Sequence, residues 1–196
     1  MQRQRTVGEY RTIDLIMFLL MVVLGEAVIC MAAASFPREL YVFSLVPVIT
    51  AIVMMRWGPW ALLHAAAGGA VYVWASGGVG TDYLVYCAGN LLGLGALVLF
   101  KLFGKERIRG DALGTMAFGV VTALLMQLGR ALVSVVSGGA AQDAILFFTA
   151  DVLTLLFTAV VMWIVRRLDG VFEDQITYLL RISKEKEEER ESSDEG

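Results

Sequence analysis

The chain contains few of the residues on which disulfide frameworks and metal sites depend. Among its 196 residues there are three prolines, two cysteines and one histidine. Cys30 and Cys87 lie in separate apolar runs, so we expect buried thiols and no disulfide framework. A zinc site needs clustered ligands, which two distant cysteines and His64 do not supply. We therefore expect no metal and no cofactor, and we interpret His64 as hydrogen-bonded within the fold.

An excess of charge of either sign is also absent. Lysine and arginine number 16, aspartate and glutamate number 19, and the formal net charge is -3. Nucleic-acid-binding domains carry a basic stripe, so we expect no nucleic-acid partner. The sequence lacks the HExxH, GxSxG and Walker lysine motifs of common enzymes and ATPases. We therefore predict that the chain is not an enzyme and draws no energy from ATP by itself.

What the chain has in excess is apolar residues, which make up 58% against about 45–50% in soluble domains. Only 18% of the residues are charged. A membrane-spanning helix needs about 20 apolar residues, and the first run is too long for the apolar region of a signal peptide. The sequence predicts an all-α bundle of six transmembrane helices within residues 13–168. The six runs are 13–35, 41–56, 59–77, 83–103, 112–136 and 144–168.

Basic residues predict how this bundle is oriented, because loops rich in lysine and arginine stay in the cytoplasm. If the chain crosses six times, one side has a single basic residue, Arg38. Both termini are then cytoplasmic, including the N-terminal segment 1–12. The basic residues of the other side are Arg3, Arg5, Arg11, Arg56, Lys101, Lys105, Arg107, Arg109, Arg166 and Arg167.

The C-terminal part of the chain changes character. Residues 169–183 place apolar residues at roughly helical spacing between polar ones. This pattern predicts an amphipathic helix on the inner membrane face or on a partner, or else an extension of the last span. Residues 184–196 carry mixed charge without apolar residues, so we expect a disordered acidic tail.

Four polar residues interrupt the apolar runs: Glu26, Asn90, Arg130 and Asp151. A charged side chain at the centre of a bilayer costs about 2.5–3.5 kcal/mol on insertion scales. Polar residues at this depth therefore need a cavity or a partner. Because successive spans alternate in direction, the four residues fall at similar depth in the outer half. They come from four different helices, which predicts one polar layer.

Further polar and aromatic residues accompany this layer. They lie three, four or seven residues from one of the four on the same helix, or near the outer end of the third run. These residues are Tyr83, Tyr86, Gln127, Thr154, Tyr72 and Trp74. Aromatic walls with a few fixed polar groups are typical of a small-molecule site, although Tyr72 and Trp74 also fit an interfacial aromatic belt.

Two interpretations of the charged residues remain open at this point. The planar guanidinium of Arg130 suits a carboxylate or phosphate of a ligand, while Glu26 and Asp151 could accept from an amine or hydroxyl. Alternatively, Arg130 forms an internal ion pair with Asp151 or Glu26 and fixes the register of the helices.

Small residues indicate where helices meet, in this chain or with a partner. Ala61, Ala65 and Gly69 are four apart in the third run, and Ala32 lies late in the first run. Such spacing permits close helix packing in membranes. It predicts either internal packing or a docking surface for a separate membrane subunit.

Residues 12–168 resemble the substrate-binding S components of energy-coupling factor (ECF) transporters. The resemblance rests on Val46-Pro47-Val48 in a short second run, Trp57-Gly58-Pro59-Trp60-Ala61 at the next turn, and Gly68-Gly69. It implies a six-helix protein of a prokaryotic cell membrane with an outer-half pocket for a vitamin-like nutrient. It also implies a transmembrane coupling subunit and two cytoplasmic ATPases as partners, with transport by toppling of the loaded subunit.

One feature departs from the family pattern. S components commonly carry alanines four apart in the first helix for docking, whereas residues 15–23 are all bulky here. Either the chain docks on a different coupling subunit, or it docks through Ala61, Ala65 and Gly69.

Three functions follow as hypotheses. The first is an S component in which Arg130, with Asn90, Gln127 and Asp151, binds a small polar or zwitterionic nutrient. The second is a lone gradient-driven transporter that uses Glu26 or Asp151 to carry protons, although the halves show no inverted repeat. The third is a membrane scaffold or an intramembrane enzyme.

Overall fold

The computed structural model describes residues 7–35, 43–168, 171–172, 181 and 184. Every regular element in these residues is a helix. Four helical stretches are long and apolar enough to cross a membrane, and Val152–Val165 is a shorter apolar helix. The four are Gly8–Ala34, Val46–Ala75, Gly80–Phe103 and Ala112–Val136.

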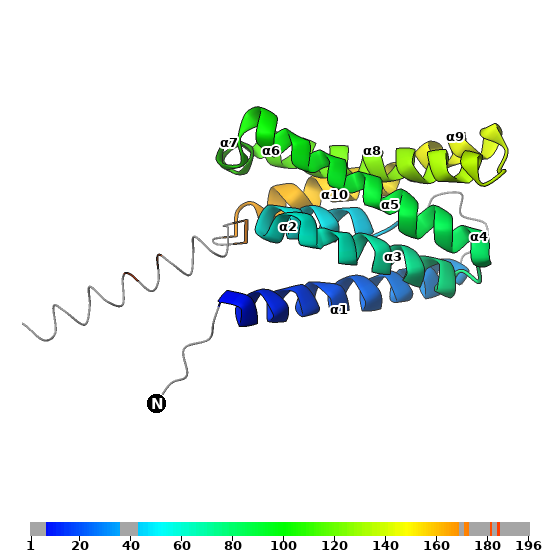
Figure 1. The fold of residues 1–196 in the computed structure, drawn as a ribbon, viewed down its shortest axis with the longest axis horizontal. Coiled ribbons are helices and arrows are strands. Elements are labelled where there is room, and N and C mark those ends of the chain that lie inside the picture. The colour runs from blue at the N-terminus through cyan, green and yellow to red at the C-terminus, as the bar shows by residue number, and fades with distance from the viewer. Residues whose placement is uncertain (1–6, 36–42, 169–170, 173–180, 182–183, 185–196) are drawn as a thin grey trace, which may run out of the picture.

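The chain runs back and forth along the bundle (Figure 1). Helix α1 (Val7–Ala34) leads to the far end, α2 (Val46–Trp57) returns, and α3 (Leu62–Ala75) leads out again. A broken helical path then returns to α7 (Lys105–Gly110), α8 (Ala112–Val136) leads out, and α9 (Ala141–Thr149) and α10 (Val152–Val165) return. Successive apolar stretches therefore alternate in direction.

The stretch Val46–Ala75 is a hairpin rather than one straight helix. Gly58 has a φ of 60°, which ends α2, and a short 3₁₀ turn, η1 (Gly58–Ala61), begins α3. The missing side chain of Gly68 faces Val46, so the two helices pack antiparallel. With 12 residues, α2 is about 18 Å long and too short to cross a bilayer of about 30 Å alone. Within the expected second span, 41–56, the helix thus begins only at Val46. Residues 36–42 lie outside the described part of the chain.

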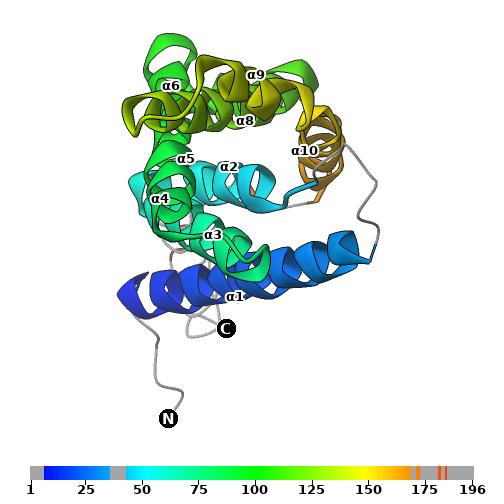
Figure 2. The same cartoon turned by 90° about the vertical axis from the view of Figure 1, so that its right-hand side faces the viewer.

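Helix α2 lies in the middle of the bundle (Figure 2). Every one of its residues except Arg56 is buried. By contrast, one face of α1 is exposed along its length, with Met17 at 58% and Leu24 at 62% exposure. A buried central helix and apolar outer faces are what a bilayer requires, because lipid replaces water around the outer helices.

The path from residue 80 to 103 is helical but irregular. It comprises α4 (Gly80–Tyr83), a π-helical segment η2 (Leu84–Ala88), α5 (Gly89–Leu91), a 3₁₀ segment η3 (Leu92–Leu97) and α6 (Val98–Phe103). Its middle passes closely between α3 and α8. The missing side chain of Gly69 faces the backbone of Tyr86, and Gly89 and Gly129 face each other's backbone. Only glycine permits this separation, because a Cβ at either position would overlap main-chain atoms.

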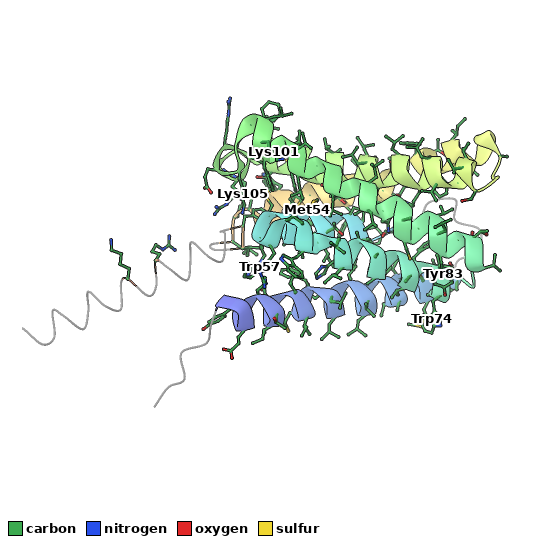
Figure 3. All side chains as sticks on the ribbon, viewed as in Figure 1. Met54, Trp57, Trp74, Tyr83, Lys101 and Lys105 are labelled. Carbon is green, nitrogen blue, oxygen red and sulfur yellow. The ribbon has the colours of Figure 1, made fainter. Side chains whose placement is uncertain are left out.

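Basic side chains gather at one end of the bundle, called here the basic end. Lys101 and Lys105 lie at the same end as Trp57, whereas Trp74 and Tyr83 lie at the opposite end (Figure 3). The last expected span, 144–168, is divided between α9 and α10, which are separated by a break at residues 150–151.

A polar network connects helices at the basic end. Asp14 accepts two bonds from Arg56, at 2.7 and 2.9 Å, and one from the indole of Trp57 at 2.5 Å. Arg56 also donates to the carbonyl of Val171, and the neighbouring Phe172 is buried. Apart from Val171, Phe172, Arg181 and Lys184, the expected amphipathic helix 169–183 and the tail 184–196 lie outside the described residues.

Candidate ligand-binding site

The centre of the site is an ion pair between α8 and the start of α10. Nη2 of Arg130 lies 2.9 Å from Oδ2 of Asp151, and both side chains are less than a tenth exposed. The amide of Gln127, one turn earlier on α8, donates to the same oxygen at 3.2 Å. The internal ion pair expected as one alternative is therefore present.

The pair lies at the break between α9 and α10. Asp151 occupies the residue before α10, and its carboxylate does not cap that helix. The side chain instead turns toward α8, where Gln127 and Arg130 are three residues apart and share a face. A continuous helix from 141 to 165 would have no such interruption at Asp151.

Aromatic rings surround the guanidinium. The carbon at its centre lies 5.5 Å from the ring centroid of Tyr86 and 6.0 Å from that of Phe147. Tyr72 packs on Tyr86 with centroids 4.5 Å apart. These distances are typical of cation–π and aromatic contacts. A cavity of about 250 Å³ opens here, lined by Tyr72, Tyr86, Arg130, Leu146, Phe147, Ala150 and Asp151.

Glu26 serves a second part of the site, at the beginning of α2. Its Oε2 accepts from the backbone N–H of Leu45 at 2.9 Å, and the hydroxyl of Ser44 accepts from the N–H of Val46 at 3.2 Å. The first N–H groups of a helix have no partner within the helix. Because α2 starts inside the bundle, these donors need buried acceptors, and a carboxylate also suits the positive end of the helix dipole.

The amide of Asn90 completes the layer from the other side. It is 3% exposed and donates to the carbonyl of Ala65 at 3.2 Å. Between Asn90 and Glu26 lies a second, small cavity of about 10 Å³. It shares Tyr72, Tyr86 and Arg130 with the larger cavity, so the two voids adjoin the same three side chains.

The layer contains more hydrogen-bond acceptors than it uses. Within the part of the chain that the structure describes, four buried side-chain oxygens of this layer have no hydrogen-bond partner. They are Oε1 of Glu26, Oδ1 of Asn90, Oε1 of Gln127 and Oδ1 of Asp151. An unpartnered buried polar group costs about 1–3 kcal/mol. Donors from water or from a bound molecule would satisfy these oxygens.

Most of the residues expected in the polar layer come together. Glu26, Asn90, Gln127, Arg130, Asp151 and Tyr86 all line the cavities or contact residues that do. Tyr83 and Trp74 do not. They are 37% and 70% exposed and lie at the end of the bundle (Figure 3). The π-helical segment Leu84–Ala88 changes the helical register between Tyr83 and Asn90, so the two do not share a face.

Among the polar and aromatic residues of the site, Ser44 and Phe147 were not expected from the sequence. Ser44 precedes a helix with proline near its start, which is a helix-start pattern that could have indicated it. Phe147 lies four residues before Asp151, which would place both on one helix face. Neither signal is specific, because serines and phenylalanines with these neighbours are common in membrane helices.

The small residues proposed for docking have different environments. Ala61 and Ala65 are fully buried, and Gly69 contacts the backbone of Tyr86. These three are therefore part of the internal packing of the bundle. Ala32 lies on α1 and is exposed.

The histidine and the acidic residues do not form a metal site in the described residues. No three His, Cys, Asp or Glu side chains are grouped there as metal ligands would be. His64 is buried, and its Nε2 lies 3.0 Å from the carbonyl oxygen of Leu15. It thus joins α3 to α1 near the basic end, as expected for a histidine bonded within the bundle.

Comparisons of the chain with protein-family models, with curated proteins and with solved structures give no match.

Proposed function

We propose that the chain is the membrane-embedded substrate-binding subunit of an ECF-type transporter. It captures a small polar or zwitterionic, vitamin-like nutrient near the outer face, and partner subunits drive uptake with ATP. The observation that carries this proposal is the buried polar layer of Glu26, Asn90, Arg130 and Asp151 beside a cavity of about 250 Å³. Ion-pair formation alone does not account for that layer, since it leaves acceptors unpartnered and a cavity beside them.

The size and walls of the cavity indicate what kind of molecule enters. Ligand pockets commonly measure about 300–1,000 Å³, so about 250 Å³ suits a molecule smaller than most drugs. Tyr72, Tyr86 and Phe147 provide flat apolar walls, and the fixed pair of Arg130 and Asp151 provides polarity at one edge. This combination selects a compact molecule with both aromatic or apolar and polar parts.

Six membrane crossings with both termini in the cytoplasm are part of the proposal. Support comes from the alternating directions of the helical segments and from the basic end. With the basic end inside the cell, the polar layer lies nearer the outer face. The short α2 and the break between α9 and α10 are then membrane-buried irregularities, tolerated because protein surrounds them.

The partners follow from what the chain lacks. It has no ATP-binding motif, so a coupling subunit and cytoplasmic ATPases would supply the energy. Since Ala61, Ala65 and Gly69 are buried in the bundle, the exposed face of α1 with Ala32 is the docking surface that we propose instead.

Purification of the protein from its own host in mild detergent tests this function. Mass spectrometry should identify a membrane coupling subunit and ATPases in the same complex. Recovery of the protein alone, together with ligand accumulation when it is reconstituted by itself in liposomes under an ion gradient, would establish the lone transporter instead. Recovery alone without any transport would favour a scaffold.

A further inference from the structure

We propose that the ligand carries a protonated amine, which lies in the small cavity between Glu26 and Asn90. The body of the ligand then occupies the larger cavity beside Tyr86 and Phe147. This inference rests on the proposed function, because it assigns a chemical class to the ligand of the same site.

When Glu26 is ionised, the charges of the layer leave a negative excess. Arg130 and Asp151 neutralise each other at 2.9 Å. Glu26 is fully buried, and its hydrogen-bond partners are the backbone N–H of Leu45 and the hydroxyl of Ser44, neither of which is cationic. A helix N-terminus contributes only about half a positive charge. A cationic ligand would therefore balance the layer, whereas a carboxylate beside Glu26 would be repelled.

The hydrogen-bonding groups lead to the same class. The amide nitrogens of Asn90 and Gln127 each donate one hydrogen bond within the chain, to Ala65 and Asp151 respectively. The oxygens of Glu26 and Asn90 that lack a partner among the described residues belong to side chains that line the small cavity. An ammonium group has three donors and no acceptor, so it satisfies both oxygens without adding an acceptor.

The dimensions also fit. A cavity of about 10 Å³ has room for one water-sized group, and an ammonium group is of that size. Tyr72, Tyr86 and Arg130 line both cavities, and Asp151 neutralises the charge of Arg130. The ligand can then extend from one cavity to the other along the two tyrosine rings. A cation on such rings gains about 0.5–2 kcal/mol.

The test uses three probes of nearly equal size with different charge: benzylamine, benzyl alcohol and benzoate. The unfolding temperature of the purified full chain in mild detergent is measured at neutral pH as each probe is titrated. We expect benzylamine to raise it with saturation, while benzyl alcohol and benzoate do not. In Glu26→Gln the apparent affinity for benzylamine should be about 10- to 100-fold weaker, because one charge-assisted hydrogen bond is lost.

Glu106→Gln is the matched control, since Glu106 is exposed at the basic end, and it should bind benzylamine as the wild type does. Unchanged benzylamine affinity in Glu26→Gln would overturn the inference.

If Glu26→Gln does not fold, the comparison of the three probes on the wild type still tests whether the ligand carries an amine. Stabilisation by benzoate would refute the amine while leaving a ligand site and the proposed function intact. Absence of any stabilisation would also refute the amine, and the proposed function would still be tested by its subunit partners.

Discussion

At the scale of single residues, the buried pair of Arg130 and Asp151 has two consequences. It joins α8 to the beginning of α10, and it fixes a guanidinium against Tyr86 and Phe147. Burying two charges gains little net energy, but removing one partner leaves the other uncompensated. The pair is therefore a structural element of the bundle as well as the polar edge of the cavity.

Replacing one partner of the pair should show how much stability is lost when the other charge stays buried alone. We expect Asp151→Ala to lower the free energy of unfolding by about 3–5 kcal/mol, because Arg130 is left buried without its partner. Glu106→Ala removes the exposed ion pair with Arg109 and should cost less than about 1 kcal/mol. Unfolding by sodium dodecyl sulfate in mixed micelles measures both. Equal losses would show that Arg130 finds another partner.

Much of this layer was predictable because apolar runs of alternating direction bring polar residues of similar depth together. Glu26, Asn90, Arg130 and Asp151 could be placed in one layer without knowing how the helices pack. The choice between ligand contact and ion pair could not be made, because it depends on distances of a few ångströms. Tyr83 does not share the face of Asn90, because a π-helical segment lies between them, for which the sequence gives no signal.

At the scale of elements, α2 is the unusual helix. It is short, almost wholly buried, and begins inside the bundle. Glu26 from α1 and Ser44 supply the missing acceptors. A helix that starts inside the bundle therefore depends on a side chain from another helix.

Variants of Glu26 should separate the hydrogen bond from the charge. Glu26→Ala removes the acceptor of the Leu45 N–H and should destabilise the protein by about 1–2 kcal/mol or more. Glu26→Gln retains an acceptor oxygen and loses only the interaction with the helix dipole, so it should lie between Ala and wild type. Thermal unfolding in one detergent gives the order. A Gln variant less stable than the Ala variant would contradict the capping role.

Close helix contacts through glycine provide a second element-scale prediction. A Cβ at Gly129 would meet the backbone oxygen of Gly89 and the side chain of Leu92. Because main-chain atoms cannot yield as a flexible side chain can, Gly129→Ala should cost about 3 kcal/mol. Gly110→Ala is the control, since nothing lies within 4 Å of the added atom. Similar unfolding temperatures for the two variants would mean that α5 and α8 can separate freely.

The helices and the turn at Gly58 could be predicted from the sequence, but two further breaks could not. Hydropathy indicated helices near 13–35, 83–103 and 112–136, and long helical stretches cover each of them. The late start of α2 and the interruption at residues 150–151 depend on tertiary partners, namely Glu26 for the first and Arg130 for the second.

At the scale of the whole molecule, the proposed function requires that the two ends of the bundle face different compartments. On a cysteine-free background, made by replacing Cys30 and Cys87, Ser137→Cys should react with a membrane-impermeant maleimide in intact cells. Lys105→Cys, at the basic end, should react only after permeabilisation. The reason is that basic loops are retained in the cytoplasm. The reverse pattern would invert the bundle and place the polar layer nearer the cytoplasm.

If the buried polar layer binds a small molecule, the protein should retain that molecule through purification in mild detergent. Small molecules released by heat from the purified wild type and from the double variant Arg130→Met, Asp151→Leu are compared by mass spectrometry. Replacing both charges by apolar residues of similar volume should keep the fold. We predict a compound in near-stoichiometric amount from the wild type and its absence from the folded double variant. Equal release from both proteins, or none from the wild type, would contradict the account and leave the layer as an internal ion-pair network.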